Sequence, residues 1–269
     1  MLHNVRALER MSVVAIDGEL GSVVDVCVDD DSWTVRYLVV EAGSTWLQGR
    51  KFLISPLSLR AVFWKLGQLD TTLTRDQVRD SPGIDVDMSI SRAYETAFFD
   101  YYGYPYYWLG PCRWGAMPFP PVFTFQPSGL DAQAAAADVA ERHQGIHLHR
   151  MHAAAGCRIH AIDGAIGHVQ DFLYSDEDWS MPFLLVDTRN WLPGRHVVLD
   201  IKWIEAISWS QRTLHVGLTR DAVRNCPEWR AEFQSLPDYE GFLAQHATRS
   251  DGSAAHRRPT RSAHVEGNK

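Results

Sequence analysis

The sequence predicts a mainly β protein with short helices, organised as two tandem copies of one small module. Three observations support this prediction: a motif that returns at a fixed offset, strand-like runs bounded by Asp and Gly turns, and the same N-terminal helix signal in both copies. Residues 1–110 form the first copy and residues 147–246 the second. A Pro- and Ala-rich linker, 111–146, joins them, and the polar, basic tail 247–269 is expected to be disordered.

The repeat is clearest at Ala15–Gly21 (AIDGELG), which returns as Ala161–Gly167 (AIDGAIG) at an offset of 146. One residue is then lost from the second copy, so that Trp46–Arg50 (WLQGR) corresponds to Trp191–Arg195 (WLPGR) at an offset of 145. Internal similarity held over this length indicates a duplicated fold. We expect the two copies to cover each other's apolar faces in a pseudo-two-fold arrangement.

Within each copy the pattern favours short antiparallel strands. In the first copy, Ser22–Val28, Val35–Val40 and Lys51–Ile54 are apolar runs bounded by turn residues. The pairs Asp17-Gly18 and Asp163-Gly164 are typical of tight hairpin turns, because glycine adopts a positive φ without steric cost. We therefore interpret both aspartates as turn formers.

A short helix follows the strands of each copy. Thr74 and Thr219 are predicted N-caps, and an aspartate lies in the first turn of both helices. Gln77 completes a capping box in the first copy, whereas Ala222 cannot do so in the second.

Each copy also ends in a predicted helical segment. In the first copy, residues 94–108 are rich in aromatic side chains, those at 94, 98, 101 and 102 share one helical face, and Gly103 and Pro105 stop the helix. The second copy has Tyr239 and Glu240 at the positions of Tyr94 and Glu95, but it lacks the aromatic end.

The charge distribution bears on whether the partner is a nucleic acid. The formal net charge is -7, and the tail 247–269 carries five basic against two acidic residues, so that residues 1–246 carry -10. An acidic body argues against nucleic acid as a partner. The start of the chain has no apolar run of signal-peptide length and no later stretch could span a membrane, so we expect a cytoplasmic protein. The four cysteines form no C-x-x-C pair and are expected to be buried free thiols.

These motifs resemble the PRC-barrel family, which is named after the photosynthetic reaction-centre H subunit and includes a ribosome-maturation factor. The resemblance is carried by Asp17–Gly21, Asp29–Val40, Trp46–Pro56 and the Tyr-Tyr-Gly-Tyr-Pro element at 101–105. It is strongest to bacterial two-repeat members and covers roughly residues 9 to 110 and 147 to 246.

The resemblance implies two small, highly bent antiparallel β-barrels that dock onto other macromolecules and share no catalytic residues. We therefore expect a non-catalytic adaptor or assembly module, not an enzyme, with a protein partner and no cofactor; a homodimer stays open. The alternative is a small-ligand or stress sensor with a pocket between the two barrels. A lesser alternative is a reaction-centre H-subunit-like role in photosynthetic electron transfer.

Two other clusters contain side chains of the types that bind metal ions. His143, His147, His149 and His152 precede the second copy; we interpret them as linker histidines, with a metal site as the alternative. The acidic runs Asp29–Asp31 and Asp176–Asp178 lack the alternating oxygens and the glycine of a calcium loop, so solvated hairpin turns are the preferred interpretation. No common phosphate-binding, zinc-protease or nucleophile-elbow motif occurs.

The predicted partner-binding residues fall in two groups. Trp46, Arg50, Trp191 and Arg195 belong to the repeated loops, where they either close one end of each module or form a patch for a partner. The other group belongs to the aromatic end of the first copy, and its rings either fill space inside the protein or anchor a partner. Its members are Tyr101, Tyr102, Tyr104, Tyr106 and Trp108.

Overall fold

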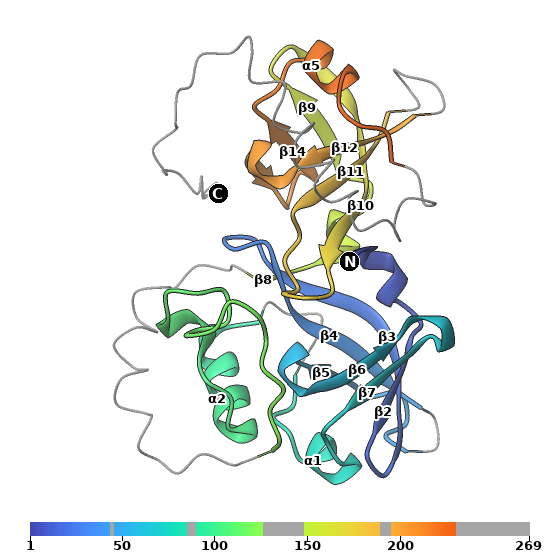
Figure 1. Cartoon of the computed structure of the whole chain (residues 1–269), viewed down its shortest axis with the longest axis vertical. Coiled ribbons are helices and arrows are strands. Elements are labelled where there is room, and N and C mark those ends of the chain that lie inside the picture. Colours follow the sequence, from blue (N-terminus) through green and yellow to red (C-terminus); the bar gives the residue numbers. More distant parts are fainter. Residues whose placement is uncertain (44–45, 85–89, 126–147, 189–194, 230–269) are drawn as a thin grey trace.

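The chain folds into two β-sheets with few short helices, and the sheets lie one above the other in Figure 1. This computed structural model describes residues 1–43, 46–84, 90–125, 148–188 and 195–229. Each sheet has seven strands, six from one repeat and one short strand from the other. The prediction of a mainly β protein with short helices is confirmed.

The first sheet lies in the lower half of Figure 1, with hydrogen-bonded order β5-β4-β3-β2-β7-β6. Its strands are β2 (Ser12–Ala15), β3 (Gly18–Asp29), β4 (Thr34–Ala42), β5 (Lys51–Ile54), β6 (Leu59–Phe63), β7 (Gln68–Thr71) and the added strand β8 (Leu148–Arg150). The helices of this repeat are η1 (Val5–Leu8), η2 (Pro56–Ser58), η3 (Trp64–Leu66), α1 (Arg75–Arg79), α2 (Arg92–Tyr102) and η4 (Tyr107–Leu109).

The second sheet has the equivalent order, β12-β11-β10-β9-β14-β13. Its strands are β9 (Arg158–Ala161), β10 (Gly164–Ser175), β11 (Phe183–Asp187), β12 (His196–Asp200), β13 (Ile204–Ser208), β14 (Thr213–Val216) and the added strand β1 (Leu2–Asn4). The helices of this repeat are α4 (Met151–Ala154), η6 (Ile201–Trp203) and α5 (Arg220–Arg224).

Neither sheet closes into a barrel, which corrects the expectation of closed antiparallel barrels. The order of the first sheet ends at β5 and β6, which are consecutive in sequence but separated by η2. Pro56 has no N–H to donate, and the next two amides bond locally: Leu57 N donates to Ser55 Oγ at 3.3 Å and Ser58 N to Ser55 O at 3.0 Å. The pairs β2–β7 and β9–β14 are parallel, so the sheets are mixed.

The predicted local signals are present. Thr74 Oγ accepts from Gln77 N at 3.2 Å while Gln77 Oε1 accepts from Thr74 N at 2.8 Å, so the capping box is confirmed. Thr219 Oγ1 accepts from Ala222 N at 3.2 Å without a return bond. All four cysteines are free, although Cys112 is only half-buried.

The first strand of each repeat pairs with the sheet of the other repeat. In β1, Leu2 lies opposite Ser175 and Asn4 opposite Leu173 of β10. In β8, Leu148 lies opposite Asp29 and Arg150 opposite Cys27 of β3. Every one of these positions maps onto its counterpart at the offset of 146, so the exchange is reciprocal and in the same register.

The tips of the two long hairpins also meet. Thr34 and Ser180, which are equivalent residues, form an isolated antiparallel bridge. On either side of it, Val35 N donates to Trp179 O at 2.9 Å and Met181 N donates to Trp33 O at 2.7 Å. Trp33 and Trp179 both have positive φ, 50° and 60°. Equivalent residues therefore hold an unfavourable conformation, which the contact between the tips compensates.

Some of the predicted segments lie outside the described residues. They are the Ala-rich part of the linker, the terminal helical segment of the second copy and the basic tail, within 126–147 and 230–269. The domain boundaries at 110 and 146 stay predictions, and β1 belongs to the first copy by sequence but to the second sheet by pairing.

Matched truncations test the strand exchange. Leu2 and Leu148 are each 4% exposed, so Leu2→Ala and Leu148→Ala should each cost about 2–4 kcal/mol. We expect Leu2→Ala to speed amide hydrogen exchange at Leu173–Ser175, and Leu148→Ala to speed it at Cys27–Asp29. Faster exchange confined to the repeat that carries the substitution would contradict reciprocal pairing.

Candidate functional site between the repeats

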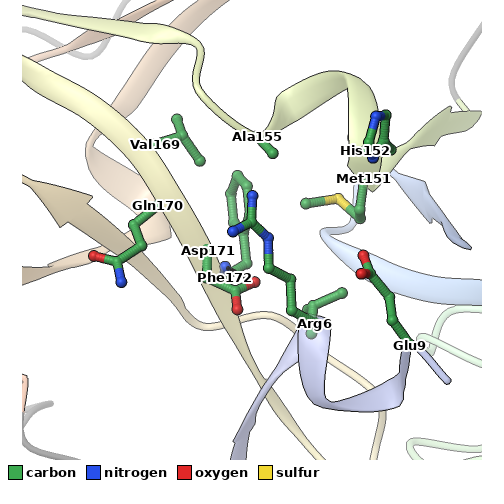
Figure 2. A pocket seen from close by; sticks show the side chains of 10 residues that line it. Arg6, Glu9, Met151, His152, Ala155, Val169, Gln170, Asp171 and Phe172 are labelled. Carbon is green, nitrogen blue, oxygen red and sulfur yellow. Dashed lines mark hydrogen bonds between the residues drawn. The ribbon is translucent and has the colours of Figure 1, made fainter. Parts of the chain in front are cut away.

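A cavity of about 180 Å³ lies where the two repeats meet, between η1, α4 and β10 (Figure 2). Its apolar wall comes from both repeats, and four charged or titratable side chains line it with Gln170. The residues that line it are Val5, Arg6, Glu9, Met151, His152, Ala155, Val169, Gln170, Asp171 and Phe172. The cavity is smaller than the pockets that hold drug-sized ligands, and it has room for several waters or one small molecule.

Asp171 is the buried acid of this cavity. It is 6% exposed and accepts a hydrogen bond from Phe172 N at 2.8 Å. Burial raises the pKa of its carboxyl to about 6, against the opposing effects of the Phe172 hydrogen bond and of Arg6. Arg6 extends from η1 across the cavity, and Glu9, which directly follows η1, points toward α4 (Figure 2). Arg6 and His152 are exposed, so the cavity opens to solvent beside them.

The equivalent carboxylate in the first repeat has a different environment. Asp25 is 1% exposed and accepts from Arg150 Nε at 2.7 Å, from His152 N at 3.1 Å and from Val26 N at 2.8 Å. The residue equivalent to Arg150 in the other repeat is Asn4. The second repeat therefore keeps the buried carboxylate but has no cation at the position that neutralises it in the first.

The histidine cluster predicted before the second copy is divided by the structure. His149 stacks on Trp209 with ring centroids 4.0 Å apart and pairs with Asp30 at 3.0 Å. His152 lines the cavity, whereas His143 and His147 lie outside the described residues. No group of three or more His, Cys, Asp or Glu side chains within the described ranges has metal-binding geometry.

His149 has an unpredicted counterpart at the start of the chain. His3 stacks on Trp64 with centroids 3.8 Å apart and bonds to Asp176 at 2.9 Å. In both cases the imidazole belongs to the exchanged strand, the indole to the same repeat and the carboxylate to the other repeat. The signal was present in the sequence, since Leu2-His3 returns as Leu148-His149 at the offset of 146.

The interpretation of the acidic runs as solvated turns is wrong for several of their members. Asp29 is 5% exposed and pairs with Arg36 at 3.1 Å. Burial acts to raise its pKa, but Arg36 and hydrogen bonds from Ser32 outweigh burial and hold the pKa below its ordinary value. Asp30 and Asp176 bind the exchanged histidines, so these acids join the repeats.

The aromatic end of the first copy packs mainly inside the protein. Tyr102 and Tyr104 are buried, with rings stacked 5.3 Å apart, while Tyr101, Tyr106 and Trp108 are half-buried. The Tyr101 hydroxyl donates to Gln77 O at 2.8 Å, and that of Tyr106 donates to Asp100. The rings of Tyr106 and Trp108 also pack on Phe99. Burial withdraws Tyr102 and Tyr104 from the surface.

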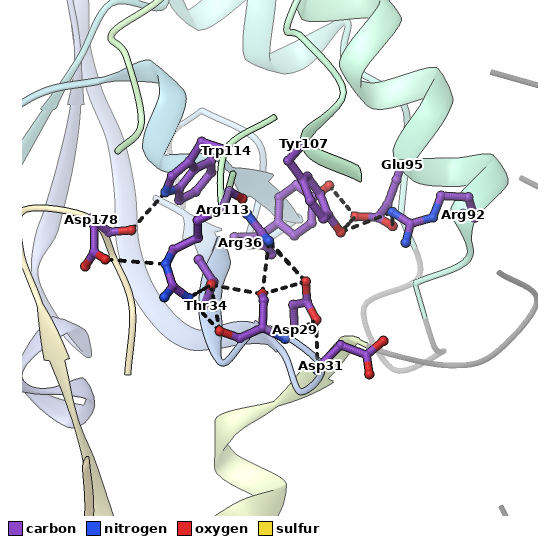
Figure 3. A network of polar contacts seen from close by, with 12 residues as sticks. Asp29, Asp31, Thr34, Arg36, Arg92, Glu95, Tyr107, Arg113, Trp114 and Asp178 are labelled. Carbon is purple, nitrogen blue, oxygen red and sulfur yellow. Dashed lines mark hydrogen bonds and ion pairs between the residues drawn. The ribbon is translucent and has the colours of Figure 1, made fainter. Parts of the chain in front are cut away.

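A polar network beneath these rings connects α2 to the hairpin tips (Figure 3). Glu95 is fully buried and accepts from Tyr37 at 2.9 Å, from Tyr107 at 2.8 Å and from Arg92 at 2.7 Å. Arg36, 3% exposed, stacks over the Tyr107 ring, 3.6 Å from its centroid. The network neutralises buried charges and fixes the orientation of α2.

The same network reaches the second repeat through residues 111–125, which follow η4 and are called the connector. Arg113 pairs with Asp178 at 3.4 Å, and its Nη1 donates to Thr34 Oγ1 at 2.7 Å. Trp114, 1% exposed, donates from Nε1 to Asp178 O at 2.8 Å. The connector therefore contacts both hairpin tips and links them.

The repeated loops are described only in part. Trp46 is half-buried, with its ring at 83° to that of Phe52 and beneath the Arg75 guanidinium. Arg50 is exposed and donates to Arg79 O at 3.3 Å. In the second copy, Arg195 O accepts from the Thr188 hydroxyl at 2.8 Å. Trp191 lies outside the described residues.

An exposed apolar surface that sequence analysis did not single out lies on the connector. We define the connector patch as Met117, Phe119 and Val122, which are 41%, 47% and 55% exposed. Two surface hollows of about 350 Å³ each lie beside this segment: Pro120 lines one, Pro118 and Phe119 line the other, and Glu177 borders both. One hollow runs along β6, the end strand of the first sheet, and no strand in the described part of the chain pairs with the outer edge of β6.

Comparison with models of protein families and with curated proteins finds no match for this chain. Among the described residues, no helix combines the length and apolarity needed to cross a membrane.

The aromatic end can be tested by truncation. Replacing Tyr104, Tyr106 and Trp108 together with Ser should destabilise the protein by more than about 5 kcal/mol, because single large-to-small changes of buried rings cost about 3–5 kcal/mol. The melting temperature measures this, with Phe119→Ser as the exposed aromatic control. A triple variant that melts with the wild type would show that these rings are not structural.

Substitution of the equivalent carboxylates Asp171 and Asp25 should change the free energy of unfolding in opposite directions. Asp171 has a raised pKa in the folded state, so its ionisation destabilises the fold increasingly as pH rises from about 4 to 6, by about 1.4 kcal/mol per pKa unit. Asp171→Asn should therefore stabilise the protein by about 1–3 kcal/mol at pH 7.5, and this gain should vanish near pH 4.

Asp25→Asn is the matched control, because it removes the carboxylate that pairs with Arg150. It should destabilise the protein by about 1–3 kcal/mol at pH 7.5. Chemical denaturation of both variants at both pH values measures the two effects. Equal effects of the same sign would contradict the asymmetry.

Proposed function

We propose that the protein is a non-catalytic adaptor or assembly module built from two PRC-type β modules in pseudo-two-fold arrangement. The connector patch is the observation that carries this proposal, because exposed apolar groups gathered on one part of the surface are typical of protein interaction sites. The acidic charge of residues 1–246 favours a protein partner over nucleic acid.

The chemistry of the surface indicates the kind of partner segment. Within the described ranges no strand pairs with the outer edge of β6, and an extended peptide can pair with such an edge as an added strand. The hollow beside it is lined by Leu59, Val62, Trp64 and Pro120, which suit apolar side chains. Glu177 borders both hollows and suits a Lys or Arg of the partner. An extended, apolar and basic segment therefore fits this surface best.

The predicted partner-binding residues take a smaller part in this proposal. Tyr106 and Trp108 are half-buried and Arg50 is exposed, so these side chains remain accessible at least in part. The connector patch is specific to the first repeat and its linker, as the predicted aromatic site also was. The proposed binding surface is therefore centred on the connector patch instead of the aromatic end, and both belong to the first copy and its linker.

A sensor of a small ligand is the second candidate, and the cavity between the repeats is the observation that favours it. Its mixture of Arg6, Glu9 and Asp171 is the acid and base lining that a polar ligand requires. No feature of the described residues favours a reaction-centre H-subunit-like role.

Site-specific crosslinking tests the adaptor function. A photoreactive phenylalanine analogue at Phe119 should crosslink a partner in the native cell, whereas the same analogue at Ile162, 65% exposed in the second repeat, should not. The triple variant Met117→Ser, Phe119→Ser, Val122→Ser should keep the wild-type melting temperature and lose at least about 90% of that partner in pull-down.

The crosslinked partner, identified by mass spectrometry, decides among the outcomes. A different protein crosslinked through an extended segment supports the adaptor function, and a second copy of this chain supports self-assembly instead. Partner capture by the triple variant at the wild-type level would show that the connector patch is not the binding surface.

A further inference from the structure

The duplication provides an internal reference for the cavity between the repeats. In the first repeat, the exchanged strand β8 brings Arg150 to Asp25, and Nε lies 2.7 Å from the carboxylate. In the second repeat, the exchanged strand β1 has Asn4 at that position and the buried carboxylate is Asp171. The same backbone register thus carries a cation in one repeat and a neutral, shorter side chain in the other.

The space beside Asp171 is open. A cavity of about 180 Å³ is lined by Asp171 and by Phe172 next to it. No ion pair within 4.0 Å joins Asp171 to another residue of the described chain. Arg6 crosses the cavity and lowers the pKa of Asp171 only in part, so the buried carboxylate keeps a raised pKa.

The charges that line the cavity favour a cationic ligand. Glu9 and Asp171 supply two negative charges against the one positive charge of Arg6, with His152 at the exposed rim. A guanidinium or ammonium group donates several hydrogen bonds and neutralises a carboxylate. The apolar side chains of Val5, Met151 and Phe172 suit a short alkyl group attached to that head.

We propose that this cavity binds a small organic cation, whose guanidinium or ammonium head lies against the Asp171 carboxylate in place of the arginine that the first repeat supplies. Both repeats line the site, so the bound cation stabilises the contact between them. This inference rests on the cavity alone and does not depend on the adaptor function.

Methylguanidinium chloride is the probe, because it carries the head group of Arg150 on one methyl group. Titration of the full chain at pH 7.5, followed by calorimetry and by NMR shifts of the Asp171 and Phe172 amides, should show saturable binding. Affinity should fall at pH 5, where Asp171 becomes protonated; Glu9, Arg6 and His152 are the other charged or titratable groups that face it. Tetramethylammonium has the charge without N–H donors and should bind at least about tenfold more weakly.

Three variants separate this site from general electrostatic attraction. Asp171→Asn should weaken methylguanidinium binding at least tenfold. Asn4→Arg rebuilds the arrangement of the first repeat, so it should also abolish binding while raising the melting temperature. Asp70→Asn removes a carboxylate of the first repeat that pairs with Arg60 and does not line the cavity, so it should leave methylguanidinium affinity at Asp171 unchanged within about twofold.

The source of the cation is distinguished by a second ligand. N-acetyl-arginine amide carries the same head on a peptide unit; its binding would identify the side chain of a partner as the source, and binding of methylguanidinium alone would identify a free small molecule. Both results support a cation site. Absence of saturable binding by either probe, equal binding by Asp171→Asn, or binding of inorganic phosphate at the same amides would overturn the proposal.

Discussion

The reciprocal pairing of β1 with β10 and of β8 with β3 is the constraint on which the rest of the structure depends. Each repeat completes the sheet of the other, so neither sheet has its seven strands without its neighbour. The stacked His3 and His149 rings and the bridge between Thr34 and Ser180 follow from this geometry. Exchange of an element between two protomers is a known route to a dimer, and here both protomers lie in one chain, so the pairing is intramolecular.

The duplicated fold requires the same residue at some equivalent positions of the two repeats, whereas the residues at other equivalent positions differ. Gly21 and Gly167 illustrate the shared part, because a Cβ at either would lie 2.0 Å from the carbonyl oxygen of Glu41 or Asp187, on the neighbouring strand. The part that differs between the repeats includes α2, the connector and the buried Glu95 network of the first repeat. It also includes Arg150, whose equivalent residue is Asn4. The candidate binding features lie in this divergent part.

The sequence predicted what depends on local pattern. The offset motif located both repeats, and the Thr caps formed as expected because their hydrogen bonds involve near neighbours. The Asp-Gly turns formed too, but Asp17 and Asp163 also accept from Arg75 N and Arg220 N, 58 and 57 positions away, which the local pattern did not indicate. Strand exchange was not predicted, since a three-residue strand such as Leu2–Asn4 carries too little pattern to name its partner. The aromatic pattern was compatible with burial and with an interface, and only tertiary packing shows that Tyr104 is buried. The cavity depends on residues as distant in the chain as Arg6 and Asp171, 165 positions apart, which no local signal connects.

The two candidate binding features share one short segment of chain. Met1 and His3 both bind Asp176, and Trp64, on which His3 stacks, lines the hollow beside β6 with Asp176. A few residues later, Arg6 and Glu9 line the cavity between the repeats. β1 and η1 are consecutive in the chain, so the residues that bind Asp176 beside the hollow lead directly into the residues that line the cavity. The exchanged N-terminal strand is therefore the part of the fold that connects the two features through the covalent chain.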